Sequence, residues 1–205
     1  MKKITLEPAI LSNPLADHIN KILKLDQPDI FEHIISRFKV LNIPKKTVLL
    51  QEGDPCRHIY FVSKGCLRLY FLKENGTQQT IQFALENWWL SDLNAFYSQG
   101  VANFTIESVE ASEVLSIDFQ SLEKLLNDFP ALEKYFRLVH QKANAAAQNR
   151  IRFLYDLSRE ELYTQFISRY PQFCQRIPQY LLASFLDITP EYLSEIRKKA
   201  LLKPA

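Results

Sequence analysis

The chain has 205 residues, of which 47% are hydrophobic and 23% are charged, and its formal net charge is +2. This length predicts one large or two modest domains, and the composition excludes a wholly disordered chain. The net charge does not by itself indicate a nucleic-acid partner, although residues 150–205 carry nine Lys or Arg against six Asp or Glu.

The first half of the chain predicts helices followed by a β-rich region. Residues 14–38 have apolar side chains at helical spacing, and Pro28 indicates the start of a second helical segment. The β-rich runs that follow are residues 47–50, 59–62, 66–72, 79–83 and 113–117. Asn75-Gly76 between two of these runs predicts a hairpin. Five or more short strands at this spacing predict an antiparallel barrel or jelly roll.

Helical spacing returns after Asp118, first as a short helix that ends near Pro130 and then as a long helix over residues 131–157, without Gly or Pro. The apolar stripe of the long helix consists of Leu132, Phe136, Val139, Ala143, Ala147, Ile151 and Leu154. The small side chains at its centre allow a second helix to pack closely, so we predict that this stripe is the seam of a homodimer. The alternative is that the stripe packs on its own domain.

The C-terminal residues predict two short helices around a tight turn. The side chains expected to face inward are Leu182, Ala183, Leu186, Leu193 and Ile196. Thr189-Pro190-Glu191 is a favourable helix start. Asp187 stands where such turns often have Gly, and Asp tolerates a left-handed backbone better than most residues. This pattern is typical of a DNA-binding helix-turn-helix, whose second helix enters the major groove, and an ordinary helical hairpin is the alternative.

The side chains left to contact DNA lie near the start and on the outer face of the second helix. They are Thr189, Glu191, Tyr192, Ser194, Glu195, Arg197, Lys198 and Lys199. A Glu carboxylate can accept a hydrogen bond from a cytosine amino group, and Arg197 can pair with guanine or with a phosphate. Lys198 and Lys199 are expected on the phosphate backbone.

Helices, a jelly roll, a long helix and a helix-turn-helix, in this order, resemble the Crp/Fnr family of bacterial transcription regulators. The local anchors are Gln51-Glu52-Gly53-Asp54, residues 59–65 and Arg68-Leu69-Tyr70, which look like the opening strands of a cyclic-nucleotide-binding domain. Gly53 and Gly65 fall at turns where a positive φ is expected.

The resemblance implies an α+β fold in three parts. These are an antiparallel jelly-roll effector domain with N-terminal helices over residues 1–130, a dimerisation helix over 131–157, and an all-α helix-turn-helix domain over 158–205. It further implies a cytoplasmic homodimer that binds double-stranded promoter DNA and contacts RNA polymerase, often under the control of a small molecule bound in the barrel.

The effector region departs from the family pattern. In the cyclic-nucleotide binders of the family, a Gly-Glu pair contacts the ribose, and an Arg-Ser/Thr-Ala run contacts the phosphate. Here Ser91-Asp92 and Ala102-Asn103-Phe104 stand in their places, so no cation meets a buried phosphate. Trp88 and Trp89 indicate an aromatic pocket with these residues. We expect no cyclic AMP binding in the usual mode, so the pocket either binds an unknown small molecule or is vestigial.

No cofactor or metal is expected. An iron–sulfur cluster needs several cysteines, and none precedes Cys56. Cys56 or His58 could ligate haem in principle, but a lone ligand in a hairpin is more often structural. The histidines are scattered, which makes a cupin-like enzyme the least favoured alternative. A ligand-binding regulatory module without DNA-binding activity is the other alternative.

The remaining features indicate a protein of the cytoplasm. The three cysteines, Cys56, Cys66 and Cys174, are widely spaced and are expected to be free thiols. No apolar stretch approaches the ~20 residues of a membrane span, and no signal peptide is expected. The six residues after Lys199 leave no room for the β-hairpin wing that the resemblance implies, so DNA affinity is expected to be modest and sensitive to salt.

Overall fold

The computed structural model describes residues 13–24 and 28–202. The helices are α1 (Pro14–Leu23), α2 (Pro28–Ile35), α3 (Leu93–Ser98), α4 (Phe119–Asp128), α5 (Ala131–Asp156), α6 (Arg159–Arg169), α7 (Pro171–Arg176), α8 (Gln179–Leu186) and α9 (Pro190–Leu202). The strands are β1 (Lys39–Ile43), β2 (Val48–Leu50), β3 (His58–Lys64), β4 (Leu67–Leu72), β5 (Gln78–Ala84), β6 (Trp89–Leu90), β7 (Thr105–Ser108) and β8 (Ser112–Asp118).

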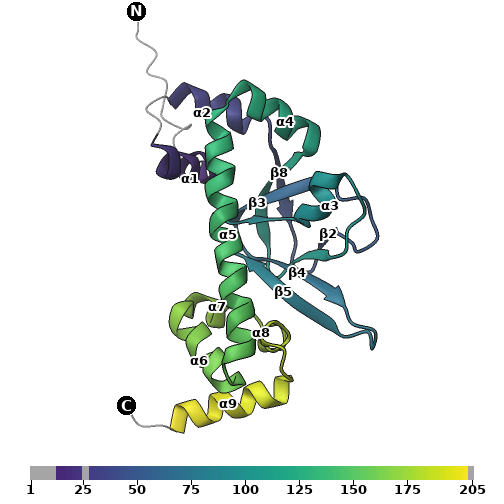
Figure 1. Ribbon diagram of the computed structural model, residues 1–205, viewed down its shortest axis with the longest axis vertical. Helices are drawn as coiled ribbons and strands as arrows, with labels where there is room; N and C mark the ends of the chain where they lie inside the picture. The colour runs from purple at the N-terminus through teal and green to yellow at the C-terminus, as the bar shows by residue number, and fades with distance from the viewer. Residues whose placement is uncertain (1–12, 25–27, 203–205) are drawn as a thin grey trace, which may run out of the picture.

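The strands form two four-stranded antiparallel sheets, with orders β1-β8-β3-β6 and β2-β7-β4-β5. The inward-facing side chains of both sheets meet in one core, which includes Phe61 of β3, Leu67 of β4, Ile106 of β7 and Leu115 of β8. The predicted α+β class with an antiparallel jelly roll, here called the β-roll, is therefore confirmed (Figure 1).

Two predicted turns have the expected backbone. Gly53 and Gly65 have φ values of 91° and 103°, and a Cβ on Gly65 would lie 2.2 Å from Ser112 Oγ, so only glycine fits there. Asn75-Gly76 closes the β4–β5 hairpin, with Gly76 at φ 77°. This hairpin leads into β5, which is the last strand of its sheet.

Helix α5 connects the β-roll to the C-terminal helices, as Figure 1 shows. Its first turns pack on the β-roll, where Tyr135 and Phe136 are buried and Trp89 Nε1 donates a hydrogen bond of 2.9 Å to Tyr135 Oη. His18 of α1 lies 2.8 Å from the same hydroxyl through Nδ1. Residues 141–149, by contrast, are exposed, so the middle of α5 has little cover from its own chain.

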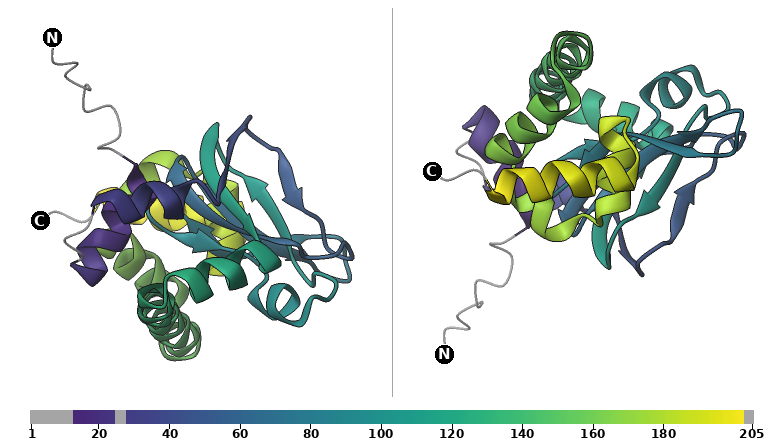
Figure 2. Two further views of the ribbon diagram at one scale, coloured as in Figure 1. Left: turned by 90° about the horizontal axis from the view of Figure 1, so that it is seen from above. Right: turned by 90° about the horizontal axis from the view of Figure 1, so that it is seen from below.

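Helices α6 to α9 enclose a second apolar core, whose buried members include Leu162, Phe173, Leu182 and Leu193. Phe83 of β5 belongs to this core, because the ring of Phe173 lies 6.0 Å from its ring. The C-terminal helices therefore pack against the outer face of the β-roll, and α9 lies across the end of the molecule (Figure 2, right).

Candidate nucleic-acid interface and effector region

Helices α8 and α9 have the geometry of a helix-turn-helix. Ala183 is fully buried, which allows the two helices to approach each other closely. Helix α8 ends at Asp187, whose φ of 55° and ψ of 48° are left-handed, as predicted. The Ile188 N–H then donates to Ala183 O at 3.0 Å and closes the turn. Leu193 and Ile196 are buried, so the inward face of α9 is committed to packing.

The start of α9 also follows the prediction. Thr189 Oγ1 accepts a hydrogen bond of 3.2 Å from the Tyr192 N–H, and Pro190 occupies the first helical position. Glu191 in the first turn interacts favourably with the positive end of the helix dipole. The Thr189 hydroxyl is therefore used to cap the helix, which leaves its neighbours as the main candidates for contact with DNA.

The predicted DNA-contacting residues differ in exposure. Those that are exposed are Thr189, Glu191, Tyr192, Glu195, Lys198 and Lys199, whereas Ser194 and Arg197 are half-buried. At 3.6 residues per turn, Glu191, Glu195 and Lys198 lie opposite the buried Leu193 and Ile196. The most outward face of α9 therefore carries two carboxylates and one ammonium group.

Lys199 is held on the side of α9. Its Nζ lies 3.0 Å from Glu160 Oε1 of α6, and both side chains are largely exposed. An exposed ion pair of this kind contributes little to stability, so Lys199 could exchange Glu160 for a phosphate at low cost.

In the effector region, both carboxylate oxygens of Asp92 accept hydrogen bonds from the backbone of its own chain. The side chain is only 2% exposed. Its Oδ1 accepts the Ala95 N–H at 3.1 Å and caps α3, and its Oδ2 accepts the Asn103 N–H at 2.8 Å. Ala102, beside Asn103, is buried and uncharged. The carboxylate that could have met a ribose therefore ties α3 to the loop before β7.

The two tryptophans pack against other aromatic side chains. Trp89 packs against Phe61 and Phe136, with ring centroids 5.3 and 5.1 Å away. Trp88 is 41% exposed, and its ring lies 6.2 Å from that of Phe173 in the C-terminal core. Trp88 lies immediately before β6, and its ring and that of Trp89 pack against different aromatic clusters.

Trp88, Trp89 and Ser91 line a cleft of about 710 Å³ between the β-roll, α5 and helices α6 to α8, whereas Asp92, Ala102, Asn103 and Phe104 are not among its lining residues. Phe104 instead packs against Phe71, at 6.4 Å between ring centroids.

The residues of the predicted apolar stripe on α5 also differ in burial. Leu132 and Phe136 are buried against the β-roll, and Val139 and Leu154 are half-buried. Ala143, Ala147 and Ile151 are exposed, and all three line the cleft. The first turns of the stripe thus pack on their own domain, and its middle is exposed, so the homodimer seam stays a prediction for residues 143–151.

Among the described residues, the thiols and potential metal ligands form no metal-binding cluster. Cys56 and Cys66 are free and buried, and burial raises the pKa of each thiol. The side chain of Cys174 lies outside the described residues. Over the part of the chain that the structure describes, no three His, Cys, Asp or Glu side chains lie close enough to hold a metal ion. Within the same residues, no helix has the length and apolar character to cross a membrane.

Comparison with known proteins finds that the chain is similar to bacterial regulatory proteins. Residues 40–129 match the cyclic nucleotide-binding domain. The chain is 27% identical over 186 residues to the anaerobic regulatory protein of Pasteurella multocida, which covers 84% of this chain and 65% of that protein. It is 26% identical over 141 residues to the regulatory protein HlyX of Actinobacillus pleuropneumoniae, which covers 69% of this chain and 57% of HlyX. The chain thus spans less than two thirds of the length of these relatives.

Solved structures share the fold. FixK2 from Bradyrhizobium japonicum has a TM-score of 0.70 at 16% identity, covering 80% of this chain and 84% of FixK2. The catabolite activator protein of Thermus thermophilus has a TM-score of 0.56 at 15% identity, covering 90% of each chain. Residues 40–129 thus match a cyclic nucleotide-binding domain, the chain is similar in sequence to regulatory proteins of the FNR and HlyX type, and its fold is that of FixK2 and the catabolite activator protein.

Proposed function

We propose that this chain is a sequence-specific transcription regulator that binds double-stranded promoter DNA as a homodimer in the cytoplasm. The observation that carries the proposal is α9, which is capped at Thr189, anchored by Leu193 and Ile196, and free along the face that bears Glu191 and Glu195. The relatives named as regulatory proteins support it, and the family resemblance adds RNA polymerase as a further partner.

We propose three parts, namely residues 1–130 as the effector domain, 131–157 as the dimerisation helix and 158–205 as the DNA-binding domain. The bounds of α5, Ala131–Asp156, support the two divisions. The first twelve and the last three residues of the chain lie outside the described residues.

The homodimer is supported by the exposed middle of α5. Ala143, Ala146 and Ala147 form a small-residue wall of the cleft, and Ile151 and Tyr155, which are 56% and 89% exposed, follow at intervals of four residues. A second copy of α5 is the occupant that fits this surface, because small side chains let two helices approach closely and each copy offers the same apolar face.

The test of DNA binding is selection from random double-stranded sequences with the intact protein, which should enrich a two-fold symmetric site. Arg197→Ala and Lys198→Ala should weaken binding to that site, whereas Glu191→Ala or Glu195→Ala should change the preferred base at one position, a discrimination of about 1–3 kcal/mol. Lys134→Ala, an exposed change on α5, is the control. No enriched site, together with unchanged affinity in the basic variants, would contradict the proposal.

We further propose that no cofactor takes part and that cyclic AMP is not the effector, which remains unidentified. Both Asp92 oxygens accept backbone N–H groups, and Ala102 offers a phosphate no charge. Calorimetric titration should show no cyclic AMP binding at micromolar concentrations. Ala102→Arg alone should not create tight binding, because Asp92 is still occupied. A dissociation constant in the micromolar range or below for the natural chain would refute this part of the proposal.

A further inference from the structure

The helix-turn-helix is attached to the edge of β5 that no other strand pairs with. Ser184 of α8 accepts a hydrogen bond of 2.8 Å from the Thr80 N–H and donates one of 2.7 Å to Gln78 O. Gln79 Nε2 also donates to Ser184 O. Because β5 is the last strand of its sheet, this one residue of α8 satisfies backbone groups that strand pairing leaves open.

An ion pair also connects the turn between α8 and α9 to the β4–β5 hairpin. Asp187 Oδ1 lies 2.9 Å from Nζ of Lys73, which belongs to the β4–β5 hairpin, and Asp187 Oδ2 lies 3.7 Å from Arg159 of α6. The hydrogen bond from Lys73 lowers the pKa of Asp187. Glycine would meet the left-handed backbone here at lower cost, so the carboxylate is what Asp adds at this position.

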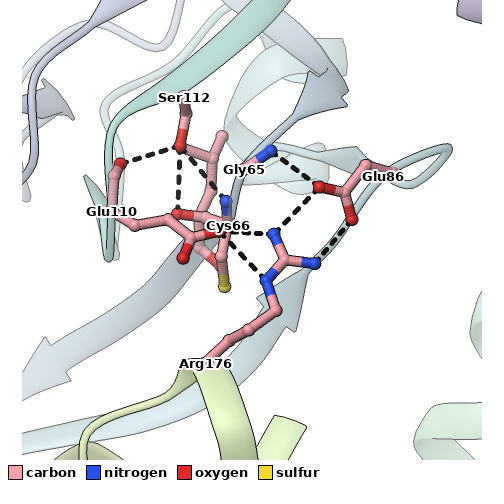
Figure 3. A network of polar contacts seen from close by, with 7 residues as sticks. Gly65, Cys66, Glu86, Glu110, Ser112 and Arg176 are labelled. Carbon is pink, nitrogen blue, oxygen red and sulfur yellow. Dashed lines mark hydrogen bonds and ion pairs between the residues drawn. The ribbon is translucent and has the colours of Figure 1, made fainter. Parts of the chain in front are cut away.

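The other sides of the motif are held as well. Arg150 of α5 donates a hydrogen bond of 2.9 Å to Phe185 O, and its guanidinium lies 4.2 Å from the centre of the Phe185 ring. Arg176 of α7 bridges Glu86 and Glu110 of the β-roll (Figure 3). These contacts involve α7, α8 and the turn, and they leave the outward residues of α9 exposed. The attachment therefore orients the reading helix without covering it.

We propose that Ser184 and Asp187 are positioning residues, which fix the orientation of α9 relative to the β-roll through the β5 edge and Lys73. This inference rests on the proposed function. A dimer must present two reading helices about 34 Å apart, one turn of DNA, so a reading helix held in one orientation binds better than a mobile one.

The attachment itself is tested without DNA by hydrogen–deuterium exchange on the full chain. In Ser184→Ala and in Asp187→Gly, the segment 78–84 should exchange faster than in the natural chain, while β3 and β8 keep their protection. Helix α8 should stay protected in Asp187→Gly, because Gly suits the left-handed turn. Asp187→Asn, which keeps the size and the tolerance of a left-handed backbone, should behave like Asp187→Gly. Unchanged exchange of 78–84 in all three variants would overturn the inference.

The positioning role is tested by affinity for the selected site. Asp187→Gly and Lys73→Ala should each weaken binding about two- to fivefold, and the double variant should be no weaker than either alone. Ser184→Ala should cost about tenfold. Faster exchange of 78–84 with unchanged or tighter DNA binding would overturn the positioning role. A natural chain that selects no site refutes the proposed function instead, and the positioning role with it.

Discussion

Arg176 and Glu86 form one of two ion pairs that join α7 to the β-roll. Arg176 Nη1 and Nη2 donate to the two Glu86 oxygens at 2.8 and 2.9 Å, and the Gly65 N–H donates to Glu86 Oε1 at 2.8 Å (Figure 3). Burial by itself raises the pKa of Glu86, but the hydrogen bonds from Arg176 and from the backbone outweigh it and lower the pKa to about 2.

This pKa predicts a dependence of stability on pH. A carboxylate whose pKa is lowered on folding stabilises the protein above its unfolded pKa and loses that contribution as the pH falls through its folded pKa. Glu86→Gln should therefore flatten the loss of stability between about pH 4.5 and 2. About a third of the side chain is exposed, so the effect is roughly 1 kcal/mol. Urea unfolding across this range measures it, with the exposed Glu74→Gln as the control; equal pH dependence in the two variants would contradict the assignment.

Single residues also show where the candidate site could be predicted. Thr189, Asp187 and Ala183 have the predicted roles because cap, turn and helix crossing are local and depend on residue type. The partners of the Asp92 carboxylate could not be foreseen from the sequence. The Asn103 N–H comes from a loop that only the fold brings to it. The contact of Trp88 with Phe173 in the C-terminal core could not be foreseen either, because it joins segments far apart in the chain.

At the level of elements, the strongly periodic segments were predicted and the weak ones were not. The long helix expected over 131–157 is α5, Ala131–Asp156, and Pro28 begins α2. Strand β1 was missed because its burial pattern shows no alternation and Val40 is exposed. β1 is a strand because β8 pairs with it, Lys39 opposite Ser116, and such distant pairing leaves no mark in a short sequence window.

The boundary between α5 and α6 depends on a capping box. Ser158 Oγ accepts the Glu161 N–H at 3.3 Å, and Glu161 Oε2 accepts the Ser158 N–H at 2.9 Å. Ser158→Ala should lower the free energy of unfolding by about 1 kcal/mol, because it leaves an N-terminal N–H of α6 without a partner. Urea unfolding measures this. Ser168→Ala, exposed within the same helix, should be neutral or slightly stabilising, and a similar loss in both variants would argue against the cap.

At the level of the whole molecule, the exposed centre of α5 predicts the assembly. Ala143→Glu combined with Ala147→Glu should convert the proposed dimer to monomers, because two carboxylates would be buried against a second helix. Light scattering gives the mass, and circular dichroism shows that the helices persist. Ala145→Glu with Gln148→Glu places the same charges on the opposite side of α5 and should keep the dimer. A dimer that survives the first pair would remove the seam from this stretch.

The length of α5 has a mechanical consequence. Its 26 residues make it about 39 Å long, and it contacts α1 and α4 near one end and carries the reading helix beyond the other. As a lever of that length, it would move its far end by about 3 Å for a tilt of about 5°, which is close to the rise of one base pair. The contact between β5 and α8 is a second connection between the β-roll and the C-terminal helices, and it restricts this tilt. A small tilt of α5 near α1 or α4 would therefore displace α9 by about one base pair only if the contact between Ser184 and β5 is broken.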